Sequence, residues 1–381
     1  MRTERLKGIF DRLLASAGIT INGNNPWDIQ VHNDKFYSAV LESGSLGMGE
    51  AYMQQWWDCD ELDEFFTRVL REKLDARITL TPKFKLEILL SRLFNHQRPA
   101  AAWRNGQKHY DIGNDLFEEM LDKHMTYTCA FWDDALTLDA AQENKLDLTC
   151  RKLNLKPGMH VLDIGCGWGS FARFAAERYG VKVTGITISP EQAELARKRC
   201  KGLPVDIQLM DYRTLHEKYD AIVSIGMFEH VGYKNYRTYM KVVHACLKDD
   251  GIFLLHTIGS NNSSTFTDQW MNKYIFPGSM LPSIRQIGQA VEGLFVMEHW
   301  ENFGVHYDKT LLAWYDNFSH NWDKLSAKYD ETFFRMWKYY LLSCAATFRA
   351  RSSQLWQMVL SRNGIAGGYA FTRRPAAIQL H

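Results

Sequence analysis

The 381-residue sequence contains no apolar stretch approaching the roughly 18 residues that a membrane-spanning helix requires. The apolar positions near its N-terminus are interrupted by Asp11 and Arg12, so we expect no secretory signal peptide. Seven cysteines lie far apart without any Cys-x-x-Cys pair, which is typical of reduced thiols. These absences predict a cytoplasmic protein whose contact with a membrane, if it has any, is peripheral.

The chain also has little net charge, because 45 lysines and arginines balance 44 acidic residues. This balance argues against binding of nucleic acid through bulk phosphate attraction, so we expect no nucleic-acid partner. The length favours about two to three domains. Aromatic residues make up 13% of the chain, which is compatible both with a large aromatic core and with a deep apolar pocket.

The most informative stretch is residues 160–169, an apolar run that ends in the turn Gly165-Cys-Gly-Trp-Gly169. It predicts a buried strand, a tight turn and then a helix over 171–179, with glycines that let a ligand approach the backbone. A dinucleotide fingerprint has the spacing G-x-G-x-x-G, which this turn lacks. The G-x-G-x-G spacing, with Asp163 two residues before it, instead resembles motif I of the S-adenosylmethionine (SAM) methyltransferases.

Further strands alternate with helical patterns along the rest of the chain. We predict strands at 181–189, 206–211, 221–226, 251–259, 295–302 and 354–361, and helices at 235–247, 310–321 and 331–349. This order predicts a doubly wound, mostly parallel sheet of seven strands with one antiparallel. Ligands of such sheets bind at the carboxyl ends of the strands. Residues 165–169, 187–192, 211–213, 227–230 and 256–259 follow strands and are therefore candidates.

The N-terminal part has a different pattern. Residues 6–17 predict an amphipathic helix, and aromatic and acidic residues at 56–66 predict a second, half-buried one. Residues 83–108 form a basic amphipathic segment, which suits either an anionic membrane surface or a solvated helix at a domain boundary. We place that boundary at 99–102, giving a small helical N-terminal domain (1–100) and a catalytic domain (101–381). Segments 109–117 and 125–132 read as loops that cover a pocket.

Motifs spread over almost the whole chain resemble those of the bacterial cyclopropane-fatty-acyl-phospholipid synthases and, less closely, the mycolic-acid cyclopropane synthases. They are GSLGMGE (44–50) with Trp56 and Trp57, HYDIGN (109–114), VLDIGCGWG (161–169), GMFEHV (226–231), LHTIGS (255–260), NKYIFP (272–277) and FRAR (348–351). Motif I alone indicates only a methyltransferase, whereas the set together is specific. The N-terminal segment favours the phospholipid enzymes, because the mycolic-acid enzymes look shorter at that end.

The resemblance implies a reaction on unsaturated phospholipid acyl chains. The SAM methyl group adds across a cis double bond, and the resulting carbocation loses a proton to bound bicarbonate as the cyclopropane ring closes. Such a cation needs a dry pocket with aromatic walls, for which Phe131, Trp132, Phe228, Phe276, Phe303 and Tyr307 are available. Because the double bond lies within a bilayer, we expect the basic segment 83–108 to make peripheral contact with anionic membrane. We also expect a homodimer. Alternatives are methyl or methylene addition to the same chains and, less compatible with the motifs, a small-molecule methyltransferase.

The resemblance also assigns site residues. The bicarbonate site corresponds to Cys129, Glu229, His256, Ile258 (through its backbone) and Tyr307. Without the resemblance, a capped carboxylate, a satisfied interior histidine and an inert buried thiol are the more usual interpretations of Glu229, His256 and Cys129. Cys344 matches a cysteine once proposed as a nucleophile, but alkyl transfer to an alkene needs no covalent enzyme intermediate, so we expect a structural role.

For SAM, the resemblance assigns Tyr127, Thr128, Asp163, Gly165, Gly167, Thr187, Ile188, Ser189, Gln192, Asp211 and Tyr212. Many methyltransferases place an acid at the end of the second strand for the ribose hydroxyls. This chain has none there, and we expect Gln192 to substitute for it. Thr128 stands where the family usually has serine and keeps the hydroxyl. We expect no metal.

Overall fold

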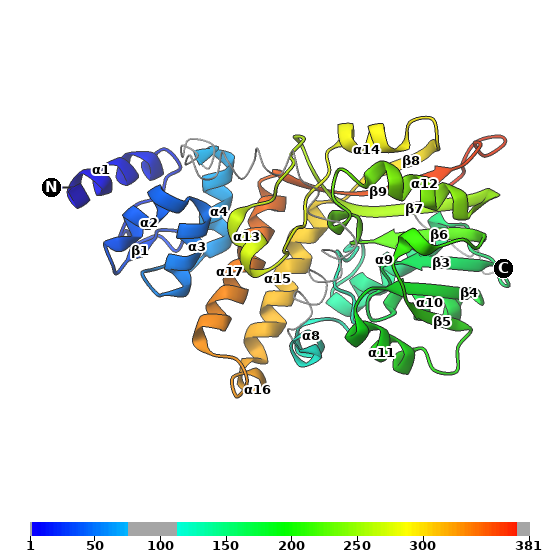
Figure 1. The fold of residues 1–381 in the computed structure, drawn as a ribbon. Coiled ribbons are helices and arrows are strands. Elements are labelled where there is room, and N and C mark those ends of the chain that lie inside the picture. The colour runs from blue at the N-terminus through cyan, green and yellow to red at the C-terminus, as the bar shows by residue number, and fades with distance from the viewer. Residues whose placement is uncertain (1, 75–112, 372–381) are drawn as a thin grey trace, which may run out of the picture.

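A computed structural model describes residues 2–74 and 113–371 of the chain. Figure 1 shows the N-terminal helices at one end, the large sheet at the other, and α15 and α17 between them. The basic segment 83–108, the expected boundary at 99–102 and all but the last two residues of the HYDIGN motif lie outside the described residues.

The large sheet has seven strands in the order β5-β4-β3-β6-β7-β9-β8. Their bounds are β3 (His160–Ile164), β4 (Lys182–Thr187), β5 (Val205–Leu209), β6 (Tyr219–Ile225), β7 (Leu247–Ser260), β8 (Val296–Asn302) and β9 (Ser353–Ser361). Strands β5, β4, β3, β6 and β7 pair in parallel, whereas β9 pairs antiparallel with both β7 and β8. The predicted fold class is therefore confirmed, including its single reversed strand.

Helices cover both faces of this sheet because its strands are apolar on both sides. Val161 packs into one buried cluster and its neighbour Leu162 into another, as the alternation of side chains along a strand requires. The covering helices are α9 (Leu138–Lys152), α10 (Ser170–Tyr179), α11 (Pro190–Arg199), α12 (Tyr236–Cys246) and α14 (Ile284–Val291), with short 3-10 turns η1 (Tyr212–Thr214) and η2 (Phe228–His230). Helix α11 begins as predicted, with Pro190 in its first turn.

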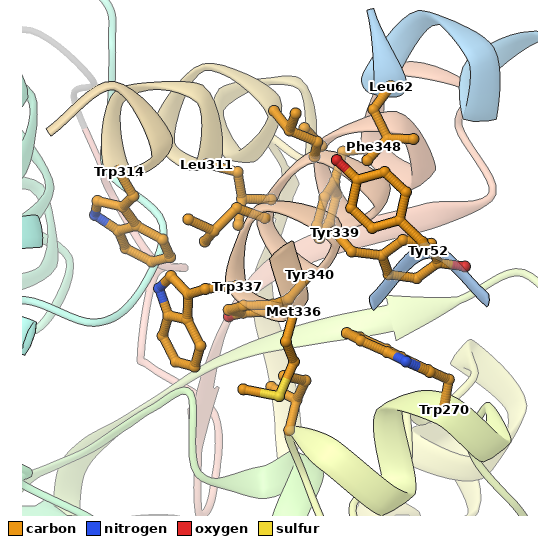
Figure 2. Close-up of a cluster of buried hydrophobic side chains, with 14 of the residues drawn as sticks. Tyr52, Leu62, Trp270, Leu311, Trp314, Met336, Trp337, Tyr339, Tyr340 and Phe348 are labelled. Atoms are coloured by element: carbon orange, nitrogen blue, oxygen red, sulfur yellow. The ribbon is translucent and has the colours of Figure 1, made fainter. Parts of the chain in front are cut away.

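A second body of helices packs beside the carboxyl edge of the sheet. It contains α1 (Arg2–Ala15), α2 (Lys35–Ser43), α3 (Ser45–Met53), α4 (Leu62–Arg71), α8 (Asn114–Met120), α13 (Gln269–Tyr274), α15 (Val305–His320), α16 (Trp322–Leu325) and α17 (Glu331–Arg349). Figure 2 shows aromatic side chains of α17 at the centre of their shared core, with Tyr52, Trp270 and Trp314 around them. The N-terminal helices thus share one core with α17, and the division at residue 100 stays a prediction.

One predicted helix is wrong in its first half. Residues 56–61 do not continue α4, because β2 (Trp57–Asp58) pairs with β1 (Gln30–Val31) in a small antiparallel sheet. Helix α4 begins only at Leu62, after Glu61. The pairing partner of Trp57 lies 26 residues earlier at Val31, so local spacing could not reveal it. Within the two described ranges, no helix is long and apolar enough to cross a membrane.

Candidate active site

A cavity of about 410 Å³ opens at the carboxyl ends of β3, β6 and β7, where the strand order predicted a ligand. Its walls come from the glycine turn after β3, the loop at 125–128, the η2 turn, and residues of α13 and α17. The first part of the predicted loop at 125–132 therefore does lie over the pocket.

The glycine turn forms one wall with its backbone. Gly165, Gly167 and Gly169 have φ angles of 83°, 54° and 80°, in the left-handed region that favours glycine. A Cβ at Gly165 would lie 2.7 Å from Cβ of Met227, so the backbone there is closely enclosed. Gly165 and Gly167 both line the cavity, as predicted for cofactor-binding residues.

Gln192 lies beside this turn. We expected it to substitute for the acid that binds the ribose hydroxyls in many methyltransferases. The Thr187 hydroxyl donates to Gln192 Oε1 at 3.0 Å, and the Gln192 N–H donates to the Ser189 hydroxyl at 3.2 Å. The hydrogen bond from Thr187 thereby fixes the orientation of the Gln192 amide. The Gln192 Nε2 atom lies close to the glycine turn, since a Cβ added to Gly167 would be 4.0 Å from it. Gln192 lines the cavity, whereas Thr187, Ile188 and Ser189 do not and stand behind it.

Two buried ionisable side chains, Asp163 and Lys145, line the cavity. Burial raises the pKa of Asp163 to about 7 although Lys145 lowers it, and burial lowers the pKa of Lys145 to about 8. Lys145 Nζ donates to the Thr128 hydroxyl at 2.8 Å, and Gln142 Nε2 donates to the Thr128 carbonyl at 2.8 Å. Lys145 and Gln142, both on α9, were not predicted. The signal that could have identified them was the presence of two polar residues on a helix face that packs on a sheet.

Of the remaining predicted cofactor residues, one lines the cavity and two do not. Tyr127 lines the cavity, and its hydroxyl lies 2.8 Å from that of Tyr340. Asp211 is paired with Arg213, and Tyr212 is buried; neither lines the cavity. The structure therefore brings together six of the predicted positions at the wall: Tyr127, Thr128, Asp163, Gly165, Gly167 and Gln192.

Glu229 is the only predicted base-site carboxyl, and it is buried in the cavity wall. Its Oε1 accepts the Ile258 N–H at 2.6 Å, while its Oε2 has no hydrogen-bond partner in the described part of the chain. Burial raises the pKa of Glu229 to about 7, against the lowering effect of hydrogen-bond donors. A carboxyl with a pKa near neutral pH can take up or release a proton.

His256 lies two residues before Ile258 on β7, so both side chains are on the same face of the sheet. Its Nδ1 is 3.1 Å from Gln357 Nε2, and its Nε2 has no partner among the described residues. Burial, followed by the charges of Lys145 and Lys152, lowers the pKa of His256 well below its usual value. The imidazole is therefore neutral. Ile258 lines the cavity, whereas His256 is not among the lining residues.

Cys129 and Tyr307 complete the predicted base site. The Cys129 thiol is fully buried, donates to the Ala130 carbonyl at 3.2 Å, and has a raised pKa because of burial. Tyr307 lines the cavity and stacks on Phe348 at 4.6 Å. Burial raises the pKa of Tyr307, and the charges of Cys129 and Glu229 add to this rise.

Cys344 also lines the cavity, but burial raises the pKa of its thiol to about 12. A nucleophilic cysteine needs a lowered pKa, so the structural role expected for Cys344 fits this environment. No cluster of three potential metal ligands occurs within residues 2–74 and 113–371.

The other half of the cavity is apolar. Of the aromatic side chains proposed for its lining, Phe276 and Tyr307 are there, but Phe131, Trp132, Phe228 and Phe303 are not. Phe266, Met271, Tyr340 and Phe348 are further apolar residues of the lining. The arrangement joins a polar end, built on the glycine turn, to an apolar end between α13 and α17.

Comparisons with known proteins agree with this geometry. The family model described as Mycolic acid cyclopropane synthetase matches residues 97–358. Cyclopropane-fatty-acyl-phospholipid synthase of Escherichia coli (strain K12) is 54% identical over 365 residues, which are 96% of this chain and 95% of that protein. Tuberculostearic acid methyltransferase UfaA1 of Mycobacterium tuberculosis (strain ATCC 25618 / H37Rv) is 34% identical, over 93% of this chain and 88% of that protein.

Among solved structures, mycolic acid cyclopropane synthase CmaA1 complexed with SAH and CTAB superimposes with a TM-score of 0.63 at 34% identity. The match covers 68% of this chain and 98% of that one, so about a third of this chain has no counterpart there. The sheet, the glycine turn and the extent of these matches lead to one conclusion: the chain is an enzyme of the SAM-dependent mycolic acid cyclopropane synthetase family.

Proposed function

We propose that this protein transfers the methyl carbon of SAM across the cis double bond of an unsaturated phospholipid acyl chain and forms a cyclopropane ring. The observation that carries the proposal is one cavity with a polar, glycine-walled end and an apolar, aromatic end. The 54% identity to a cyclopropane-fatty-acyl-phospholipid synthase over nearly the full chain supports this substrate class.

Methyl transfer breaks the S–CH₃ bond of SAM and forms a bond from that carbon to one alkene carbon. The other alkene carbon becomes positive, and ring closure releases one proton from the added carbon. An alkene is a weak nucleophile, so the two reactants must be held close and in line. The glycine turn and Gln192 would hold the donor, and Phe276, Tyr307 and Tyr340 also line the cavity, where aromatic rings would stabilise a developing cation.

The released proton needs a base. Bicarbonate, when bound beside Glu229, supplies that base. The described residues fit such an anion, because Glu229 Oε2 and His256 Nε2 are both buried and both lack partners among them. A neutral imidazole with its proton on Nε2 donates to an anion, and a protonated Glu229 does the same. Tyr307 lies on the same wall with a hydroxyl of raised pKa, which keeps its proton.

The test is direct. Purified protein is incubated with SAM and vesicles of unsaturated phospholipid, and the fatty acids are then analysed by mass spectrometry and NMR. A gain of one CH₂ with loss of the alkene protons supports the proposal. Absence of product on every unsaturated chain tested would refute it.

A second candidate is methyl or methylene addition to the same chains, in which the cation is quenched in another way. The 34% identity to a tuberculostearic acid methyltransferase favours keeping it. The same experiment separates the two, because a branched methyl product or retained alkene character would select the second.

We further propose a cytoplasmic homodimer that docks peripherally on anionic membrane, with the N-terminal helices presenting acyl chains to the cavity. The lysines and arginines of the basic segment 83–108 supply the positive charge for this docking. Docking by charge weakens with salt, because the Debye length falls from about 10 Å at 0.1 M to about 3 Å at 1 M. Vesicle sedimentation at both salt concentrations is compared for wild type and for a variant with Lys83, Lys85, Arg92 and Arg98 changed to Gln. Equal binding at low salt would contradict docking through this segment.

Sedimentation velocity of the purified protein tests the proposed dimer.

A further inference from the structure

Behind the cavity wall, a chain of buried polar groups ends at His256. Lys152 of α9 is completely buried and pairs with Glu301 of β8. Lys152 Nζ also donates to Gln357 Oε1 at 2.8 Å. Gln357 of β9 is itself fully buried and lies opposite His256 in the β7–β9 register.

Two contacts fix the orientation of the Gln357 amide. An ammonium group has donors only, so the atom that faces Lys152 must be the carbonyl oxygen of Gln357. The Thr149 hydroxyl lies 3.3 Å from Gln357 Nε2 and already donates its proton to the Lys145 carbonyl at 2.8 Å. Thr149 can therefore only accept from Gln357. Both neighbours require the oxygen toward Lys152 and the NH₂ group away from it.

The second hydrogen of this NH₂ group points to His256 Nδ1, 3.1 Å away. Nδ1 must accept it, and in a neutral imidazole the proton is then on Nε2. Nε2 is the ring nitrogen that has no partner within the described ranges. The Lys152 ammonium thus fixes the orientation of the Gln357 amide, and this amide in turn fixes the tautomer of His256.

We infer that Gln357 is a positioning residue that fixes His256 as the Nε2–H tautomer and so presents a hydrogen-bond donor to the proton-accepting anion. The role of that donor rests on the proposed function, whereas the tautomer itself does not. A wrong tautomer at a catalytic histidine removes the hydrogen bond at the reacting group and can cost several orders of magnitude in rate.

The variant Gln357→Glu tests this assignment with almost no change in shape. One carboxylate oxygen still accepts from Lys152, but the other now faces His256 Nδ1 as an acceptor. We expect Nδ1 to become protonated, which ¹⁵N chemical shifts of histidine-labelled protein report. The His256 signals are assigned by their loss in a His256→Gln variant. On unsaturated vesicles we expect kcat to fall by about 100-fold or more, with the SAM affinity kept.

The matched control is Gln354→Glu, the same change three residues earlier and therefore on the opposite face of β9. Its amide oxygen accepts from Asn302 and Arg351 and does not contact His256. We expect His256 Nδ1 to stay unprotonated in this control. Gln357→Met, which removes the donor without adding a carboxylate, is the second variant should Gln357→Glu not fold. It should lose the fixed tautomer and at least about tenfold in rate.

The outcomes are distinguishable. A protonated Nδ1 in the wild type, or an unprotonated Nδ1 in Gln357→Glu, would overturn the assignment. If Nδ1 changes as expected but the rate does not, Gln357 does set the tautomer, and it is the role of His256 in the proposed base site that fails.

Discussion

At the scale of the residue, the candidate site contains the buried carboxyl of Glu229, which has no ion-pair partner among the described residues. Glu229 receives only hydrogen bonds from the backbone and from Thr257, and these do not offset its loss of hydration. Burial also raises the pKa of Asp163 to about 7, although the charge of Lys145 acts against this rise. Glu229 therefore keeps a proton that can be exchanged near neutral pH, as an acid–base role requires.

The first prediction concerns turnover. Glu229→Gln and His256→Ala should each lower kcat by at least about 100-fold, because general acid–base groups contribute on that scale. The dissociation constant of SAM, measured by calorimetry, should change by less than about twofold, because the polar end of the cavity is built from other residues. Glu292→Gln, an exposed carboxyl-to-amide change at the end of α14, is the control. A wild-type rate in either variant would remove that residue from the base site.

The second prediction concerns stability. The pKa of Glu229 is raised from 4.5 to about 7, so between these pH values the folded state binds more protons than the unfolded state. The contribution of Glu229 to the free energy of unfolding is therefore lost as the pH rises from about 4.5 to about 7, and it is smallest at high pH. Glu229→Gln should equal wild type near pH 4.5 and exceed it by up to about 3 kcal/mol at pH 8. Urea denaturation at several pH values, without bicarbonate, measures the difference. A difference that does not vary with pH would contradict the buried, uncompensated carboxyl.

At the scale of the element, the strand–turn–helix unit holds the cofactor end of the cavity, and the third prediction tests it. Gly165→Ala places a Cβ 2.7 Å from Met227 at a φ of 83°. Gly158 has a similar φ of 86° with nothing within 4 Å, so Gly158→Ala pays the same backbone cost of about 1–2 kcal/mol without a clash. We expect at least tenfold weaker SAM binding for Gly165→Ala and no change for Gly158→Ala. Equal affinities in calorimetry would mean that backbone approach at Gly165 is not needed.

The strands and long helices were predictable because their apolar periodicity is local. Each predicted strand of the sheet overlaps an observed one, and the helix predicted over 331–349 has the bounds of α17. Features that depend on distant partners were not predictable. Trp57 leaves the expected helix to pair with Val31, and Gln357 meets Lys152 across more than 200 residues of sequence. The same limit applies to the site: six of the eleven predicted cofactor residues line the cavity, whereas Lys145, Gln142 and Gln357 were missed.

At the scale of the whole molecule, the N-terminal helices are fastened to the walls of the cavity. Arg335 of α17 donates to the Tyr52 carbonyl at 2.6 Å and to Asp58, and it covers the Tyr52 ring. Arg349 of the FRAR motif bridges Asp308 of α15 and Asp63 of α4. Because α17 also lines the cavity, we expect a change in the packing of the N-terminal helices to affect the site.

The last prediction tests this coupling in the full chain. Gly49 of α3 packs so closely on Trp270 of α13 that an added Cβ would lie 2.3 Å from the ring, and α13 also carries the cavity residue Met271. Gly49→Ala should therefore cost about 1–3 kcal/mol of stability and lower the rate on vesicles, with SAM affinity unchanged. Gly8→Ala is the matched control, since Gly8 is also helical and its nearest added contact, Arg12, is 3.8 Å away. It should be neutral or stabilising by up to about 1 kcal/mol. If Gly49→Ala loses stability but keeps the full rate on vesicles, the N-terminal helices support the fold without presenting the acyl chain.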